Sequence, residues 1–114
     1  MALRKVKHVH HLSDGGKDLL DVNLDIEKGT VKRFALNYRA LIKDEWHIIY
    51  RLDNYHAYLH EQRFWISKEP IPLEDEERTY TTNYIVELYS ERIALNYRRY
   101  KNYYLKKLKK IKGD

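Results

Sequence analysis

The sequence predicts an α+β fold in which an antiparallel meander of three or four strands is covered by one long C-terminal helix. Three observations indicate this fold. Apolar and polar residues alternate through the first half of the chain, short polar turns separate the alternating segments, and apolar residues recur at steps of three and four after residue 80. Strands that follow one another through short turns pair in antiparallel order, so a meander is expected.

The first two expected strands form a hairpin. Residues 20–26 place every second side chain on one apolar face: Leu20, Val22, Leu24 and Ile26. The segment 27–30 then turns the chain, because Gly29 adopts positive φ without a steric cost. Residues 33–42 return with their own apolar face: Phe34, Leu36, Tyr38, Ala40 and Ile42.

Two further extended segments complete the expected sheet. After a turn at 43–45, the third strand is predicted to bury four alternate residues: Trp46, Ile48, Tyr50 and Leu52. Asn54 is expected to turn the chain in the left-handed conformation that asparagine tolerates. The segment 58–67 then pairs back as a fourth strand.

The second half of the chain is predicted to be helical. Pro70 and Pro72 exclude a helix and a central strand around them, and the acidic run 74–77 is expected to form a solvated loop. A cap near Thr81 or Asn83 begins a helix from about Thr82 to Lys110. Its apolar stripe is Ile85, Tyr89, Ile93, Tyr97, Tyr100, Tyr104, Leu108 and Ile111.

Composition limits the class of protein. The 114 residues have a mass of 13.9 kDa, which suits one domain over residues 1–114. Cysteine is absent, which excludes disulfides and thiolate metal ligands. We expect a cytoplasmic protein, because neither a secretion signal nor an apolar run of about 20 residues is present. One glutamine among many lysines and glutamates is typical of heat-adapted proteins.

Positive charge is concentrated at one end of the chain. The net charge is +5, yet residues 98–114 hold eight basic residues and one acidic residue, a net of +7, so the remainder nets −2. This lysine-rich helical extension predicts contacts with nucleic-acid phosphates or an acidic partner, although cations also suit a helix C-terminus. The expected nucleic-acid-binding residues are Arg98, Arg99, Lys101, Lys106, Lys107, Lys109 and Lys110, and Lys112 adds to the charge.

The segment YRLDNYHAYLH, residues 50–60, holds the candidate catalytic residues. Arg51 and Asp53 lie two apart on a strand and share a face, so an ion pair that closes the strand is one interpretation. A histidine beside Arg51 that exchanges protons near neutral pH is the other. We expect Arg51, Asp53, His56 and His60 to converge on one solvent-accessible pocket.

A metal site is not expected. On a strand, residues four apart lie roughly 13 Å from each other, so His56 and His60 cannot chelate one ion together. His8, His10 and His11 would contribute only if the fold brought the N-terminal segment close to them. We therefore expect neither a metal nor another cofactor.

The run from Val31 to Phe64 resembles a known family. It contains RFALNYRALI, a short turn, EWHIIYRLDNYH and then a second histidine in LHEQRFW. This pattern is similar to that of small prokaryotic proteins marked by R-x-D-N-x-H followed closely by H, some of which are grouped with the TumE-like toxins encoded beside a helix-turn-helix antitoxin. The resemblance implies that Arg51, Asp53, Asn54, His56 and His60 form a shared polar cluster.

Two functions are compatible with the sequence. In the first, a toxin-like protein with an antitoxin partner acts on RNA as a metal-independent ribonuclease, with a histidine moving protons and Arg51 stabilising charge on a phosphate. In the second, no catalysis occurs and the basic helical end binds nucleic acid or a protein. A homodimer through the C-terminal helix is a further expectation, whereas a membrane partner is not.

Overall fold

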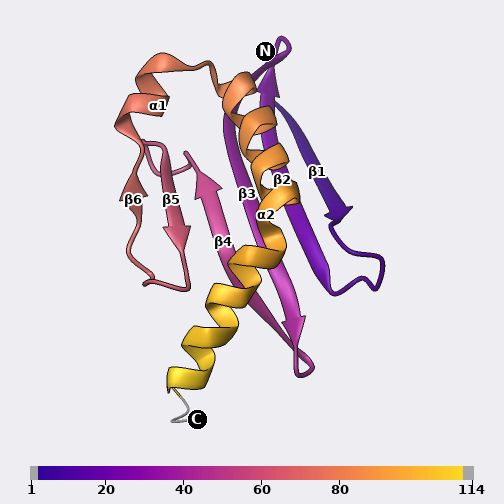
Figure 1. The fold of residues 1–114 in the computed structure, drawn as a ribbon. Coiled ribbons are helices and arrows are strands. Elements are labelled where there is room, and N and C mark those ends of the chain that lie inside the picture. The colour runs from indigo at the N-terminus through magenta and orange to yellow at the C-terminus, as the bar shows by residue number, and fades with distance from the viewer. Residues whose placement is uncertain (1–2, 112–114) are drawn as a thin grey trace.

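The computed structural model describes residues 3–111 and forms one six-stranded antiparallel sheet with two helices on one face (Figure 1). The strands pair in sequence order: β1 (Arg4–His11), β2 (Asp18–Glu27), β3 (Thr30–Ile42), β4 (Glu45–Asp53), β5 (His60–Arg63) and β6 (Ile71–Pro72). The helices are α1 (Glu74–Thr79) and α2 (Thr82–Ile111). The α+β class, the antiparallel sheet and the long C-terminal helix are confirmed, but the sheet has more strands than predicted.

Both predicted hairpin turns are present. Lys28 and Gly29 have φ values of 51° and 79° between β2 and β3, and Lys43 and Asp44 have values of 49° and 66° between β3 and β4. Two consecutive residues with positive φ match the twist of the flanking strands, which is why such turns close tight hairpins.

The prediction missed two edge strands. β1 pairs with β2 along its whole length, from Arg4 opposite Ile26 to His11 opposite Leu19. Nearly all its side chains are exposed, so lysine and histidine occupy positions where a buried strand would show apolar alternation. β6 is only two residues long, and its Pro72 is tolerated because it lies at an edge.

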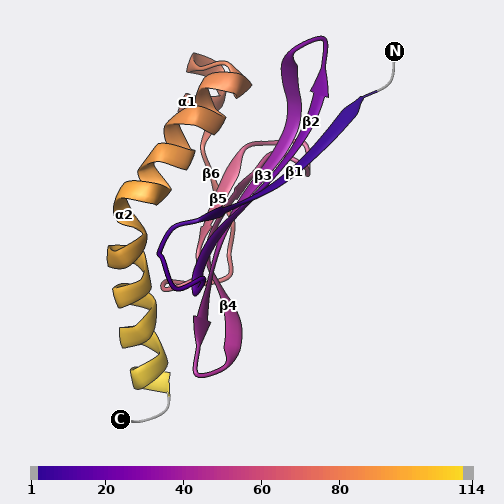
Figure 2. The same cartoon turned by 90° about the vertical axis from the view of Figure 1, so that its right-hand side faces the viewer.

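A bulge in β4 overturns part of the predicted buried face. Tyr38 pairs with Tyr50 but Arg39 pairs with Ile48, so Ile49 is an extra residue in the ladder. The extra residue reverses the face of every side chain before it. Ile49, Tyr50 and Leu52 are therefore buried, whereas Trp46 and Ile48 are 45% and 44% exposed. Figure 2 shows that the helices lie on one side of the sheet and leave its other face open.

The segment between β4 and α2 also differs from the prediction. The fourth extended segment reaches only from His60 to Arg63, not from 58 to 67. Asn54 does not have positive φ; Ala57, at 76°, makes the left-handed turn instead. The acidic run 74–77 opens α1 rather than a loop, because carboxylates are favourable at the first turn of a helix.

Helix α2 crosses the sheet and completes the core. The four residues that it buries, Ile85, Tyr89, Ile93 and Tyr97, pack on the predicted apolar face of β2 and β3. The expected cap is present: the Tyr84 amide donates to Thr81 Oγ1 at 3.2 Å. Asn83 ties this end to the β2–β3 turn, because its side-chain oxygen accepts the Val31 amide at 2.9 Å.

Candidate functional sites

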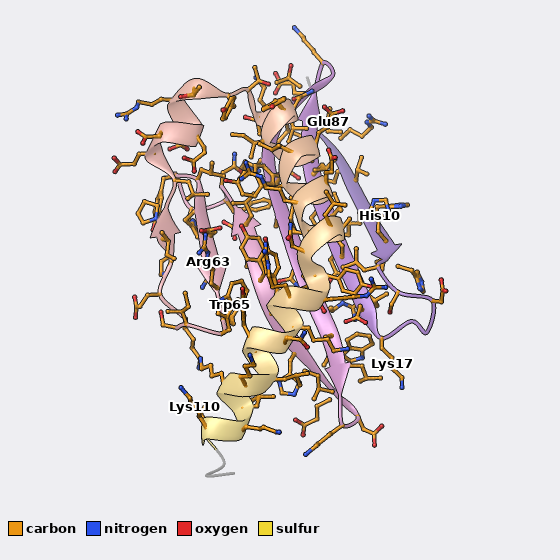
Figure 3. All side chains as sticks on the ribbon, in the orientation of Figure 1. His10, Lys17, Arg63, Trp65, Glu87 and Lys110 are labelled. Atoms are coloured by element: carbon orange, nitrogen blue, oxygen red, sulfur yellow. The ribbon has the colours of Figure 1, made fainter. Side chains whose placement is uncertain are left out.

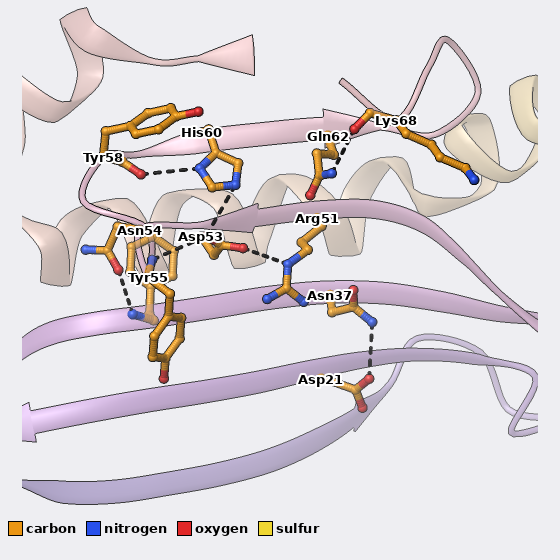
Figure 4. A network of polar contacts seen from close by, with 11 residues as sticks. Asp21, Asn37, Arg51, Asp53, Asn54, Tyr55, Tyr58, His60, Gln62 and Lys68 are labelled. Carbon is orange, nitrogen blue, oxygen red and sulfur yellow. Dashed lines mark hydrogen bonds and ion pairs between the residues drawn. The ribbon is translucent and has the colours of Figure 1, made fainter. Parts of the chain in front are cut away.

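Three of the four predicted catalytic residues meet on the uncovered face of the sheet (Figure 4). Arg51 Nε donates to Asp53 Oδ2 at 2.6 Å, and His60 Nε2 lies 3.4 Å from Asp53 Oδ1. The sheet register produces this arrangement, since Asp53 on β4 is paired with His60 on β5. The Tyr55 amide donates a further hydrogen bond to Asp53 Oδ1 at 3.2 Å.

The centre of this network is buried, contrary to the predicted accessible pocket. Asp53 is 1% exposed and His60 is 5% exposed. His60 Nδ1 lies 3.3 Å from the carbonyl oxygen of Tyr58, so both ring nitrogens already face oxygen atoms of the protein. A histidine held in this way orients Asp53, and Asp53 in turn fixes the guanidinium of Arg51.

His56 does not join the network, which corrects the predicted convergence. It is exposed in the turn before β5, with its ring centroid 6.4 Å from that of His60. Within residues 3–111 no hydrogen bond or ion pair connects His56 to Arg51 or Asp53. The predicted strand parity failed because His56 lies in the turn that contains Ala57.

Asn54 has a structural part in the same region. Its side-chain oxygen accepts the Phe34 amide at 2.8 Å, and its own amide donates to the Phe34 carbonyl at 3.2 Å. Its Nδ2 also donates to the Lys32 carbonyl at 3.3 Å. These bonds fasten the end of β4 to β3, so Asn54 is engaged entirely with backbone.

The histidines of β1 do not assemble a metal site in the described residues. The rings of His8 and His10 lie 4.1 Å apart in an edge arrangement, and the pKa of His10 is lowered by burial and by its neighbour His8. Across residues 3–111, no group of three potential ligands comes close enough to hold a metal ion. No helix in the same range is both long and apolar enough to cross a membrane.

A second candidate site lies on the helix side of the sheet. It is a groove of about 680 Å³ bordered by α1, β5 and α2. One wall is a stack of aromatic rings, with centroid distances of 5.0 Å between Trp65 and Tyr100 and 5.5 Å between Tyr50 and Tyr100. Tyr103 lies 5.7 Å from Trp65 and is 42% exposed.

A buried carboxylate supports the floor of this groove. Glu61 is 5% exposed; its Oε2 accepts the Tyr50 hydroxyl at 2.5 Å, and its Oε1 lies 2.8 Å from Arg63 Nη2. Burial and the adjacent negative charge of Glu61 raise the pKa of Tyr50, which keeps its hydroxyl a donor. Figure 3 shows Arg63 and Trp65 beside the middle of α2.

Two further arginines border the groove from α2. Arg92 and Arg99 are seven residues apart and therefore share a helix face. Arg99 Nη2 donates to Asn96 Oδ1 at 2.6 Å, and the Arg92 guanidinium lies over the Tyr89 ring. Burial raises the pKa of Tyr100; the charges of Arg99, Arg63 and Arg92 act to lower it, and the charge of Glu61 acts to raise it.

The predicted basic end of α2 divides into engaged and exposed residues. Lys101 Nζ lies 3.3 Å from Asp18 Oδ1, and Lys107 Nζ donates to the Phe64 carbonyl at 2.7 Å, so both attach the helix to the sheet. The exposed members are Arg98, Arg99, Lys106, Lys109 and Lys110. Lys112 and the end of the predicted extension lie outside the described residues.

Sequence reasoning missed the groove because its residues are scattered. Glu61, Arg63 and Trp65 come from β5 and the turn after it, whereas Arg92 and Arg99 follow some 30 residues later. The usable signal was the seven-residue spacing of these two arginines beside the aromatic pair Tyr100 and Tyr103. Only the direction of α2 across the sheet brings the two groups together.

The chain belongs to a family defined by a domain of unknown function, DUF7718, whose family model matches residues 4–110. No curated protein and no solved structure matches the chain.

Proposed function

We propose, from the geometry alone, that the protein binds single-stranded RNA along the outer side of α2 and does not cleave it. One observation carries the proposal: a stripe of exposed cations on α2 runs from the aromatic groove toward the C-terminal turns of that helix. Its members share one helix face: Arg92, Arg99, Lys106 and Lys110.

Stacking and charge together favour a single strand. Proteins that bind single-stranded nucleic acid combine a positively charged track for phosphates with aromatic rings on which unpaired bases stack. Here the cations of α2 supply the track, and Trp65 and Tyr103 supply rings beside it. The resemblance to TumE-like toxins also favours RNA as the partner, and an antitoxin stays a prediction of that resemblance.

The surroundings of the histidines favour binding over cleavage. A general acid or base must reach the atom whose proton it moves. His60 is buried with both ring nitrogens facing protein oxygens, and the exposed His56 has neither Arg51 nor Asp53 as a partner in the described chain. The Arg51 network therefore supports the strand rather than a reaction.

Charge-neutralising variants test the proposal. We expect Lys106→Gln with Lys110→Gln to weaken binding of a fluorescent single-stranded RNA and to lower its salt dependence by about 0.7 in log–log slope for each phosphate that is no longer neutralised. The control, Lys5→Gln with Lys7→Gln, makes the same charge change on β1 and should have a smaller effect. Equal weakening by both pairs, or intact RNA binding in the first, would reject the proposal.

RNA integrity is measured in the same samples. The proposal predicts that the RNA stays full-length during incubation with the intact chain. Cleavage that disappears in a His56→Ala variant would replace binding with the ribonuclease function.

A further inference from the structure

We infer that the groove between α1, β5 and α2 binds a nucleoside phosphate, with the base against Trp65 and Tyr103 and the phosphate among Arg63, Arg92 and Arg99. The inference rests on the proposed function because the groove forms part of the proposed RNA-binding surface. It goes further by naming a ligand for the groove itself. A free nucleotide and the phosphorylated end of an RNA chain share this chemistry.

The dimensions of the groove suit such a ligand. Its volume of about 680 Å³ lies inside the range of roughly 300–1,000 Å³ that is typical of small-molecule sites. One end is walled by the stack of Tyr50, Tyr100 and Trp65, and Tyr103 leaves 42% of its surface accessible beside them. A planar base has faces to stack on these rings, whereas a branched aliphatic ligand does not.

The charges of the groove favour an anion. Glu61 is occupied by Arg63 and by the Tyr50 hydroxyl, so its negative charge is already compensated. Among residues 3–111, Arg92 and Arg99 form no ion pair with a carboxylate. Guanidinium groups bind phosphate through two parallel hydrogen bonds, so these arginines have donors to offer.

The remaining acidic residues of the groove lining come from α1. Asp75 and Glu76 belong to α1, and Asp75 is paired with Arg78 at 2.7 Å. Burial and the negative charge of Glu76 raise the pKa of Tyr89, while the Arg92 guanidinium over the Tyr89 ring acts to lower it. Arg99 directly precedes Tyr100 on α2 and forms no ion pair in the described residues, so we assign the phosphate to the part of the groove that Arg99 borders.

Tryptophan fluorescence tests the inference directly. The chain has two tryptophans, so Trp46→Phe leaves Trp65 as the only reporter. In this background we expect AMP to change Trp65 fluorescence saturably, with adenosine and inorganic phosphate binding at least about tenfold more weakly because each makes only part of the contacts. Adding Arg99→Gln should weaken AMP binding about tenfold.

Arg98→Gln is the matched control. Arg98 is the preceding residue on the same helix; its guanidinium lies over the ring of Tyr97, and neither residue lines the groove. AMP affinity should be unchanged in this variant, and thermal melts should show both variants folded. No saturable response to AMP, or equal weakening by Arg98→Gln and Arg99→Gln, would overturn the inference.

The ligands separate this inference from the proposed function. RNA binding without AMP binding would reject the nucleotide site and leave the RNA proposal standing. AMP binding without RNA binding would reject the RNA proposal and leave the nucleotide site standing. A 5′-phosphorylated RNA that binds more tightly than the same RNA with a 5′-hydroxyl, and loses this advantage in Arg99→Gln, would identify the RNA end as the source of the phosphate. Equal binding of the two RNAs together with AMP binding would identify the free nucleotide as the ligand.

Discussion

Two buried carboxylates on neighbouring strands hold arginines in the same way but face opposite sides of the sheet. Asp53 binds Arg51, two residues earlier on β4, and Glu61 binds Arg63, two residues later on β5. Asp53 is enclosed by His60 and the Tyr55 amide, whereas Glu61 supports a groove that α2 completes. One local arrangement thus supports the fold on one face and a candidate site on the other.

The difference between the two faces lies in what surrounds each arginine. On the uncovered face, Arg51 borders shallow hollows that it shares with Asn37 and Lys7 of the sheet and with Tyr55 of the turn after β4. On the helix face, Arg63 meets a second element that supplies cations and aromatic rings. The groove on the helix face is the stronger candidate site because α2 adds arginines and stacked aromatic rings beside Arg63.

The largest expected effect is a decrease in stability on the uncovered face. Asp53→Ala removes the buried carboxylate that accepts the Arg51 hydrogen bond and lies beside the His60 ring, so we expect the free energy of unfolding to fall by about 3 kcal/mol. Urea unfolding measures this change. Because Asp53 is structural in this account, RNA affinity should stay unchanged at temperatures where the variant is folded; a stable variant that no longer binds RNA would reverse the roles of the two faces.

The next effect concerns the carboxylate that attaches α2 to the sheet. Burial alone would raise the pKa of Asp18, but hydrogen bonds from Tyr38 and Ser13 and the charge of Lys101 outweigh it and lower that pKa. A carboxyl group whose pKa is lower in the folded state than in the unfolded state stabilises the fold at pH values above its unfolded-state pKa. This stabilisation is lost as the pH falls through the folded-state pKa.

Asp18→Asn should therefore cost about 1–2 kcal/mol near neutral pH, and the deficit should shrink below about pH 4 as the wild-type carboxylate is protonated. Urea titrations of both chains from about pH 7 to about pH 3 cover this range and measure the difference. A deficit that stayed constant or grew with acidity would show that the ionised form contributes nothing.

The smallest effect is a gain in stability at the turn that separates His56 from the Asp53 network. Ala57 has a φ of 76°. A residue with a Cβ atom pays a steric cost in this conformation, whereas glycine does not. We expect Ala57→Gly to raise the free energy of unfolding by about 0.5 kcal/mol, while Ala40→Gly, in the buried part of β3, should lower it. A decrease in both variants would mean that this turn is not strained.

The sequence predicted what local periodicity determines. The apolar faces of β2 and β3, both hairpin turns and the span of α2 follow from spacing and turn chemistry, and the Arg51–Asp53 pair follows from residues two apart on a strand. The exposed edge strand β1 gave no signal because it buries little. The bulge at Ile49 reversed the faces of Trp46 and Ile48, and no local pattern indicates such an insertion.

The candidate sites were predicted unequally for the same reason. Arg51, Asp53 and His60 are close in the chain, so their proximity could be inferred, but the burial of His60 and the separation of His56 depend on a turn whose left-handed residue is an alanine. The groove depends on how a long helix lies across the sheet. Residue spacing predicts which face of α2 carries Arg92 and Arg99, but not what lies opposite them.

The most direct test of the assignment of binding to the helix face is a paired RNA titration of Arg99→Gln and Arg51→Gln. Both substitutions remove one arginine charge, and both chains are titrated with the same single-stranded RNA at a temperature where each is folded. We predict that Arg99→Gln weakens binding by about tenfold, whereas Arg51→Gln changes it by less than about twofold. Weakening confined to Arg51→Gln would contradict the account and assign binding to the uncovered face.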